Sequence, residues 1–216
     1  PPGGTALVGE SISEALDFRN AMRKVGDEYG DSWWFPVWGP ESFERNGDGG
    51  RRDDWMLKSS DKWHGFGSLQ PGFNMLDPIK ATIITPGLDI DGNFHDGGIP
   101  AAVVTKYLAE HGVVVEKTSL YSFFIMFTIG ITKGRWNTLL TALQQFKDDY
   151  DRNQPMWRIM PEFCQQHRRY ERMGLRDLCQ HVHQLYAKYD IARLTTDMYL
   201  SELTPAMNPA DAYACI

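Results

Sequence analysis

The chain has 216 residues, of which 42% are hydrophobic and 12% aromatic, enough to bury the core of one large domain or two small ones. Its 22 basic and 28 acidic residues give a net charge of −6, which argues against a nucleic-acid partner, since a nucleic-acid backbone requires a basic face. The longest apolar run, residues 120–131, is too short to cross a bilayer. We therefore expect a folded cytoplasmic protein that binds neither nucleic acid nor membrane.

The cysteines and the chain ends add two expectations. Cys164, Cys179 and Cys215 form no C-x-x-C pair, and an odd number does not close a disulfide framework, so a reducing compartment is expected. The chain begins at Pro1 without Met and stops at Ile216 soon after a loop. We expect a piece of a longer protein.

The amino-terminal part predicts one helix followed by irregular structure. Apolar side chains recur on one face of residues 10–29, and Gly30 ends that helix. Four segments follow. Residues 33–38 are aromatic and β-like, and residues 41–54 are predicted to form a polar surface loop. A short strand is expected at residues 55–57 and an aromatic turn at residues 63–67.

Residues 77–134 are typical of a compact β-α-β-β block. β-forming residues run up to a Pro86-Gly87 turn, and Pro100 provides a start signal for the next helix. The predicted elements are a strand within residues 77–87, a helix over 101–111, a short buried strand over 113–115 and an internal strand over 120–131.

The carboxy-terminal part is predicted to be helical. Helices are expected over residues 135–150, 174–189 and 191–203, and residues 154–171 are less regular, with a turn of helix at 162–167. The chain thus divides into a leading helix (residues 1–30), an α/β unit (residues 31–150) and a helical region (residues 151–216).

The strongest candidate site is Glu116-Lys117-Thr118. It follows the apolar residues 113–115, which places its side chains at the mouth of a sheet, where ligands often gather. A carboxylate there can pair with a cationic ligand group. The alternative is a surface Glu–Lys pair of little energetic value.

Two histidine-containing clusters have structural alternatives that we favour. His64, between Trp63 and Phe66, could stack on a ligand such as a cofactor, but a packed histidine is the preferred interpretation. Cys179, His181 and His183 resemble a metal set. On a helix His181 points away from the other two, and no second cluster completes four ligands, so no metal site is predicted.

Two further segments carry weaker signals. Lys80 could form a Schiff base if desolvated, but an outward-facing strand lysine is the preferred interpretation. Asp89, Asp91 and Asn93 have a calcium-like spacing without the distal Glu of such a loop, so a hairpin-like connection is expected.

Taken together, six strings resemble the carboxy-terminal part of the bacterial ornithine/lysine/arginine decarboxylases, enzymes that use pyridoxal phosphate and share the aspartate-aminotransferase fold. In chain order these strings are Trp63-His64-Gly65-Phe66, Leu76-Asp77-Pro78-Ile79-Lys80, Thr85-Pro86-Gly87, Gly98-Ile99-Pro100-Ala101, Val114-Val115-Glu116-Lys117-Thr118 and Ile129-Gly130-Ile131. Residues 131–136 and 174–178 look most like the lysine decarboxylase branch.

The resemblance implies a fold. Residues 1–30 would lead out of a missing large cofactor domain, and residues 31–150 would form the small α/β domain. This domain would have a mostly antiparallel sheet with helices packed on one side, followed by a carboxy-terminal helical tail.

The resemblance also implies an activity. The parent enzyme would convert lysine, arginine or ornithine to the amine and CO2, as a homodimer or higher homo-oligomer. The family's Schiff-base lysine lies in a Ser-x-His-Lys string, and no His-Lys dipeptide occurs here. The chain alone is therefore expected to be inactive, with no catalytic residue of its own.

The resemblance assigns substrate binding to Glu116, which would pair with the distal cation of the substrate, while Lys117 and Thr118 are weaker candidates. Ser119 departs from the family pattern, which has Gly at this place, and this puts the identity of the substrate in doubt. A stand-alone ligand-binding module and a structural assembly domain remain as alternatives.

Overall fold

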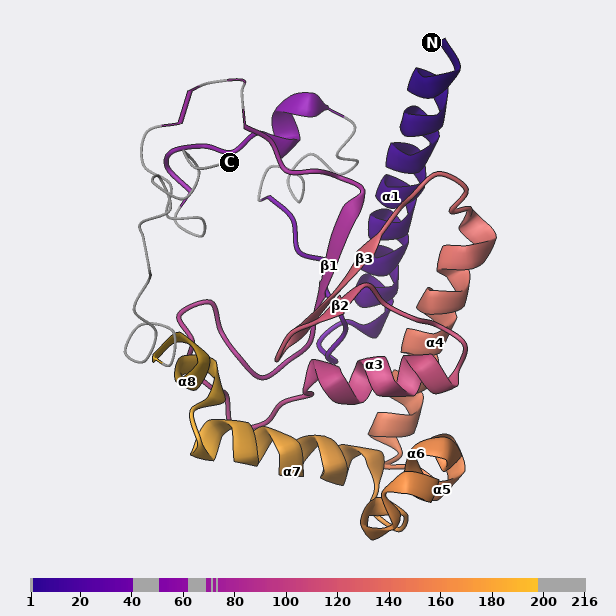
Figure 1. The fold of residues 1–216 in the computed structure, drawn as a ribbon, viewed down its shortest axis with the longest axis vertical. Helices are drawn as coiled ribbons and strands as arrows, with labels where there is room; N and C mark the ends of the chain where they lie inside the picture. Colours follow the sequence, from indigo (N-terminus) through magenta and orange to yellow (C-terminus); the bar gives the residue numbers. More distant parts are fainter. Residues whose placement is uncertain (1, 41–50, 62–68, 71, 73, 198–216) are drawn as a thin grey trace, which may run out of the picture.

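The computed structural model describes residues 2–40, 51–61, 69–70, 72 and 74–197 (Figure 1). The predictions for His64, for residues 41–50 of the surface loop, for the aromatic turn and for residues beyond 197 lie outside these residues. The end of the surface loop predicted over residues 41–54 is described and differs, since residues 52–55 form a 3-10 helix in which Asp54 is buried. The described part contains seven α-helices and one three-stranded antiparallel sheet.

The helices are α1 (Pro2–Tyr29), α3 (Ala101–Glu110), α4 (Lys133–Asp151), α5 (Met156–Ile159), α6 (Pro161–Gln166), α7 (Leu175–Lys188) and α8 (Ile191–Asp197). The strands are β1 (Lys80–Ile84), β2 (Lys117–Thr118) and β3 (Ser122–Met126), and two 3-10 helices are η1 (Arg52–Trp55) and η2 (Arg168–Tyr170).

The sheet has the strand order β1-β3-β2, so β3 is the internal strand. Ile83 pairs with Phe123 and Ala81 pairs with Ile125. Because successive side chains of a strand point to opposite faces, these four apolar residues share one face of the sheet. The predicted mixed α and β composition, the antiparallel sheet and the internal strand are confirmed.

Helices α1, α3 and α4 contribute buried side chains to the core that covers this face (Figure 1). Phe18 of α1 is fully buried, with its ring centroid 5.4 Å from that of Phe127 and 5.9 Å from that of Trp136. Burial of one such aromatic side chain is worth about 1.5–3 kcal/mol. The helix pair α1 and α4 is therefore joined to the end of β3 by aromatic packing.

A buried arginine ties α1 to the sheet. Arg19 is 3% exposed and donates hydrogen bonds to the carbonyl oxygens of Trp38 at 2.8 Å and of Lys80 at 2.9 Å. Burial lowers the pKa of Arg19 to about 10. The start of β1 and the segment before residue 40 are thus fixed to the same helix.

Four strand predictions need correction. Residues 33–38 form no strand, and Val37 makes a single bridge to Ile83. Residues 113–115 form no strand: they follow a left-handed turn at Gly112, whose φ is +80°, and Val114 is 88% exposed while Val113 and Val115 pack against the core. Residues 55–57 form no strand either: η1 ends at Trp55, and Met56 makes a single bridge to Met75. The strand predicted over residues 120–131 is shorter, since β3 ends at Met126.

The helix predictions are confirmed as far as the described residues reach, with shifts at some ends. Helix α1 begins at Pro2, earlier than the predicted residue 10, while α4 and α7 begin and end within two residues of their predicted bounds. The irregular stretch at residues 154–171 contains α5, α6 and η2, and α6 is the predicted turn of helix. None of the described helices combines the length and apolar composition needed to cross a bilayer.

Candidate functional site

The β2–β3 hairpin positions the candidate site at the edge of the sheet. The N–H of Glu116 donates to the carbonyl of Phe124 at 2.9 Å, and the N–H of Ser119 donates to that of Ser122 at 2.8 Å. Strand β2 contains two residues, and the Thr118 hydroxyl lies 3.2 Å from that of Thr105 on α3. This short edge strand is therefore held by β3 on one side and by α3 on the other.

Glu116, Lys117 and Thr118 are all exposed, but they do not face the same way. Thr118 pairs with Phe123 on the helix-covered face, and Lys117 pairs with Phe124 on the opposite face. Glu116 lies in a bend just before β2, and its N–H bonds the carbonyl of Phe124, the residue that Lys117 pairs with, so the alternation of the strand does not extend to it. Within β2 the structure thus separates Lys117 from Thr118, and of the three predicted site residues only Glu116 lines a hollow, which is described next.

Glu116 borders a hollow of about 280 Å³ between the hairpin, the loop after β3 and the start of α4. Its lining residues are Val113, Val114, Glu116, Ile125, Met126, Phe127, Thr128, Ile131, Arg135, Trp136 and Leu139. Most are apolar, and Glu116 is the single carboxylate among them. Such a hollow can surround a hydrocarbon chain and pair the cation at its end with a carboxylate.

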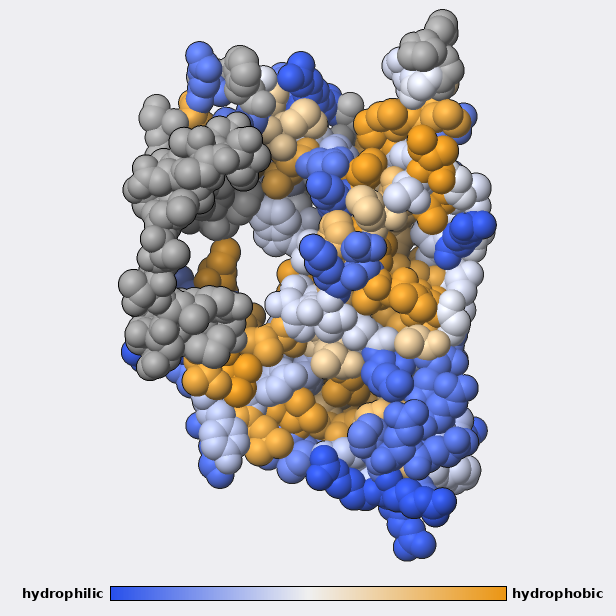
Figure 2. All heavy atoms as spheres, in the orientation of Figure 1, coloured by the Kyte–Doolittle hydropathy of each residue, from blue (hydrophilic) through white to orange (hydrophobic). Residues whose placement is uncertain are grey.

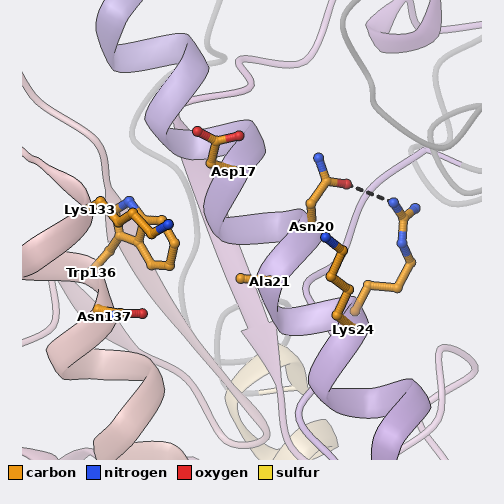
Figure 3. Close-up of a pocket in the computed structure, with 8 residues that line it drawn as sticks. Asp17, Asn20, Ala21, Lys24, Lys133, Trp136 and Asn137 are labelled. Atoms are coloured by element: carbon orange, nitrogen blue, oxygen red, sulfur yellow. Dashed lines mark hydrogen bonds between the residues drawn. The ribbon is translucent and has the colours of Figure 1, made fainter.

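A second hollow, of about 580 Å³, lies between α1 and α4 (Figure 3). Its lining includes Asp17, Asn20 and Lys24 of α1 and Lys133 and Asn137 of α4. The charges on its walls are mixed, and none of the predicted site residues lines it.

The two hollows have one residue in common. Trp136 lines both, and its Nε1 donates a 2.6 Å hydrogen bond to Glu14 Oε2 of α1. The indole therefore forms a wall between the carboxylate-bearing hollow and the α1–α4 hollow.

The hydrophobic surface borders these hollows. Figure 2 shows hydrophobic atoms gathered over the amino-terminal half of α1 and toward the start of α4, and hydrophilic atoms over α5 and α6. Leu7 and Val8 of α1 and Ile129 after β3 are among the exposed apolar side chains, at 42%, 54% and 63% exposure.

The weaker candidates have ordinary structural surroundings. Lys80 is exposed, and its Nζ lies 3.9 Å from Asp77 Oδ2, which confirms the outward-facing strand lysine. Asn93 donates to Asp89 through its backbone N–H and its side-chain amide, and these hydrogen bonds lower the pKa of Asp89. Leu88 bridges Phe94 across this turn, which confirms the hairpin-like connection.

Helix α7 places the three members of the possible metal set on two different faces, as their spacing predicts. Cys179 and His183 are buried on the inner face of α7, and His181 is exposed. No three His, Cys, Asp or Glu side chains of the described residues are grouped as metal ligands would be.

The sequence interpretation missed a buried contact that involves His183. The Tyr121 hydroxyl lies 2.6 Å from His183 Nδ1, and His183 Nε2 lies 2.8 Å from the carbonyl oxygen of His95. Tyr121 belongs to the turn that joins β2 to β3, and burial raises the pKa of its hydroxyl. The two side chains are 62 positions apart, and no local sequence signal links them.

The sequence and the fold have known relatives. A sequence model of the family described as Orn/Lys/Arg decarboxylase, major domain, matches residues 2–135, more than half of the chain. Lysine decarboxylase LdcA of Pseudomonas aeruginosa is 44% identical over 214 residues, which cover 98% of this chain and 28% of the relative. The biodegradative arginine decarboxylase of Escherichia coli is 32% identical over 230 residues, which cover 99% of this chain and 30% of the relative.

Two solved lysine decarboxylase structures resemble the fold of this chain. Lysine decarboxylase A from Pseudomonas aeruginosa superposes with a TM-score of 0.82 at 41% identity, over 98% of this chain and 28% of that one. The constitutive lysine decarboxylase of E. coli superposes with a TM-score of 0.80 at 34% identity, over 98% of this chain and 29% of that one. The chain thus spans less than a third of the length of these relatives, and it belongs to the Orn/Lys/Arg decarboxylase family.

Proposed function

We propose that this chain is the carboxy-terminal portion of a longer decarboxylase that removes CO2 from a basic amino acid, with lysine as the favoured substrate. Two observations support the proposal: the similar lysine decarboxylases, and the small share of their length that the chain spans. On this proposal the helix-covered sheet serves as the small domain of the whole enzyme.

The part that this chain plays is recognition of the distal cation of the substrate by Glu116. The observation that carries this role is the position of Glu116 as the single carboxylate on a hollow that is otherwise mainly apolar. The apolar wall accommodates the methylene groups, and the carboxylate accepts charge-assisted hydrogen bonds from the terminal ammonium. Such a pair favours a basic substrate over a neutral one of the same length.

Pyridoxal phosphate, the cofactor that the resemblance implies, does not fit the residues described here. Its attachment requires a lysine in surroundings that lower the pKa of the amine. The described lysines are exposed apart from Lys147, whose Nζ is paired with Asp151 Oδ2 at 2.7 Å. On this proposal, cofactor attachment belongs to the rest of the longer polypeptide.

The test is an assay of the full-length protein for CO2 release from lysine, arginine and ornithine. Glu116→Gln is expected to raise the KM for the preferred substrate by about 10- to 100-fold, because a hydrogen bond to a charged group is worth about 1.5–3 kcal/mol. Glu162→Gln, at an exposed glutamate of α6, is the matched control and should leave the KM unchanged. Absence of CO2 release from all three substrates would overturn the decarboxylase, and unchanged kinetics of Glu116→Gln would overturn the role of that residue.

A further inference from the structure

We propose that His183 of α7 is a positioning residue for substrate binding: by holding Tyr121, it fixes the β2–β3 hairpin and, through the hairpin, the carboxylate of Glu116. This inference rests on the role of Glu116 proposed above. It gives α7, which lies outside the residues matched by the family model, a part in the site.

The hydrogen bonds define which atom of His183 carries the proton. The carbonyl oxygen of His95 can only accept, so His183 Nε2 donates to it over 2.8 Å. With a single proton on the ring, Nδ1 is left to accept the Tyr121 hydroxyl proton over 2.6 Å. The imidazole thus bonds the hairpin at one nitrogen and the loop before α3 at the other.

The surroundings leave this pair little freedom to move. Tyr121 is 4% exposed and His183 is 2% exposed. Gly87 and Gly98 lie so close to these rings that a Cβ at either glycine would collide with Tyr121 or His183. The pair is therefore tightly packed as well as hydrogen bonded.

The turn held by Tyr121 also has backbone attachments. The Tyr121 carbonyl accepts from the N–H of Thr85 at 2.9 Å, and the neighbouring Leu120 carbonyl accepts from the N–H of Ala101 at 2.8 Å. These bonds fix the main chain of the turn to the end of β1 and to the start of α3. The Tyr121 side chain adds the attachment to α7.

The position of Glu116 depends on this turn because the strand between them is short. β2 has two residues, and at about 3.4 Å per residue Glu116 lies roughly 10 Å from Ser119 at the turn. A short edge strand has few ladder hydrogen bonds to resist displacement, so a shift at the turn is transmitted along it. A misplacement of about 1 Å in a binding group can cost up to roughly 100-fold in rate.

The experiment compares two tyrosines in the full-length decarboxylase. Tyr121→Phe removes the hydroxyl that bonds His183, and Tyr107→Phe removes an equally buried hydroxyl that bonds Asp149 between α3 and α4, away from the hairpin. Both variants are expected to lower stability. Only Tyr121→Phe is expected to raise the KM for the basic amino acid, by roughly 3- to 30-fold, with a smaller change in kcat.

A double variant separates positioning from a general structural effect. In the Glu116→Gln background, Tyr121→Phe should have little further effect on the KM, because the group that it positions has already been removed. His183→Gln, whose amide can both donate and accept, should raise the KM less than His183→Phe does. Faster amide exchange of the Ser119 N–H in Tyr121→Phe than in Tyr107→Phe would show loosening of the hairpin directly.

The outcomes are distinguishable. If Glu116→Gln raises the KM while Tyr121→Phe and Tyr107→Phe leave it equally unchanged, the positioning role is overturned and the role of Glu116 stands. Additive effects of Glu116→Gln and Tyr121→Phe would also overturn the positioning role. Unchanged kinetics of Glu116→Gln would remove the proposed function itself.

Discussion

The hydroxyl of Tyr107 lies 2.7 Å from Oδ2 of Asp149 and joins α3 to α4 within the core. Gln145 donates to the other carboxylate oxygen at 3.2 Å, and the ring of His111 stacks on that of Tyr107 with centroids 4.0 Å apart. Burial and the neighbouring carboxylate raise the pKa of Tyr107, so its hydroxyl remains the donor. The Asp149 carboxylate is only 8% exposed and depends on these donors for its hydrogen bonds.

Tyr107→Phe is expected to lower the free energy of unfolding by about 1–3 kcal/mol, because a buried carboxylate loses a donor. Urea unfolding followed by fluorescence measures the change. Tyr189→Phe, at a tyrosine that is 59% exposed, is the matched control and should stay within about 0.5 kcal/mol of the parent. Equal stability of the two variants would contradict a stabilising role of the Tyr107 bond.

A second buried contact joins α4 to the end of α1. Lys147 Nζ donates hydrogen bonds to Asp151 Oδ2 at 2.7 Å and to the Ser32 hydroxyl at 2.8 Å. It also lies over two aromatic rings, 4.7 Å from the ring centroid of Tyr29 and 4.6 Å from that of Trp33. Lys147→Met keeps most of the side-chain volume and removes the charge. The expected loss of stability is about 1–3 kcal/mol, from the cation–π contacts and the charged hydrogen bonds.

The control for this change is Lys106→Met, at an exposed lysine of α3, which should be nearly neutral in thermal or urea unfolding. If Lys147→Met proves as stable as Lys106→Met, the buried ammonium contributes no net stability, since its desolvation offsets its contacts.

Neighbouring glycines provide a test of the packing around His183. A Cβ at Gly98 would collide with His183 Nδ1 and its ring, whereas a Cβ at Gly97 would meet only the flexible end of Gln180 at 3.3 Å. Gly98→Ala should therefore destabilise the protein by about 1–3 kcal/mol through overpacking, and Gly97→Ala should cost little. Differential scanning calorimetry of the two variants gives the comparison, and equal melting temperatures would refute the close packing.

The buried thiols are expected to be unreactive. Burial raises the pKa of Cys179, and burial and nearby carboxylates raise that of Cys164, so at any given pH each thiol has a smaller thiolate fraction than a free cysteine. Iodoacetamide labelling, read by peptide mass spectrometry, should modify both slowly in the native state, faster as the pH rises, and fully in urea. Rapid labelling of Cys179 at neutral pH would contradict its burial.

The elements best predicted from the sequence are those whose periodicity extends over several turns or a whole strand. The apolar residues of α4 and α7 recur at helical spacing, and the register of β1 against β3 places Ile83 opposite Phe123, as two apolar strands require. In these segments local composition and tertiary burial favour the same structure.

The prediction failed where tertiary contacts or chain direction decide the structure. The apolar run at residues 113–115 predicts a buried strand, but after the left-handed turn at Gly112 it pairs with no strand, and only Val113 and Val115 pack against the core while Val114 is exposed. At the candidate site, Glu116 could be identified from the sequence, while its neighbour Arg135 on the hollow, 19 positions later, could not. The Tyr121–His183 bond depends on how α7 lies against the hairpin, which no periodicity encodes.

The indole of Trp136 has a consequence for the interpretation of mutants. Because it separates the two hollows and is fixed to Glu14 of α1, changes on the far side of the helix pair can alter the volume next to Glu116 without touching any ligand. A substitution at Lys24 or Asn137 that changes substrate affinity would therefore not, by itself, identify that residue as a contact of the bound molecule. A structure of the mutant that shows whether the indole ring has rotated would distinguish an indirect effect from a direct one.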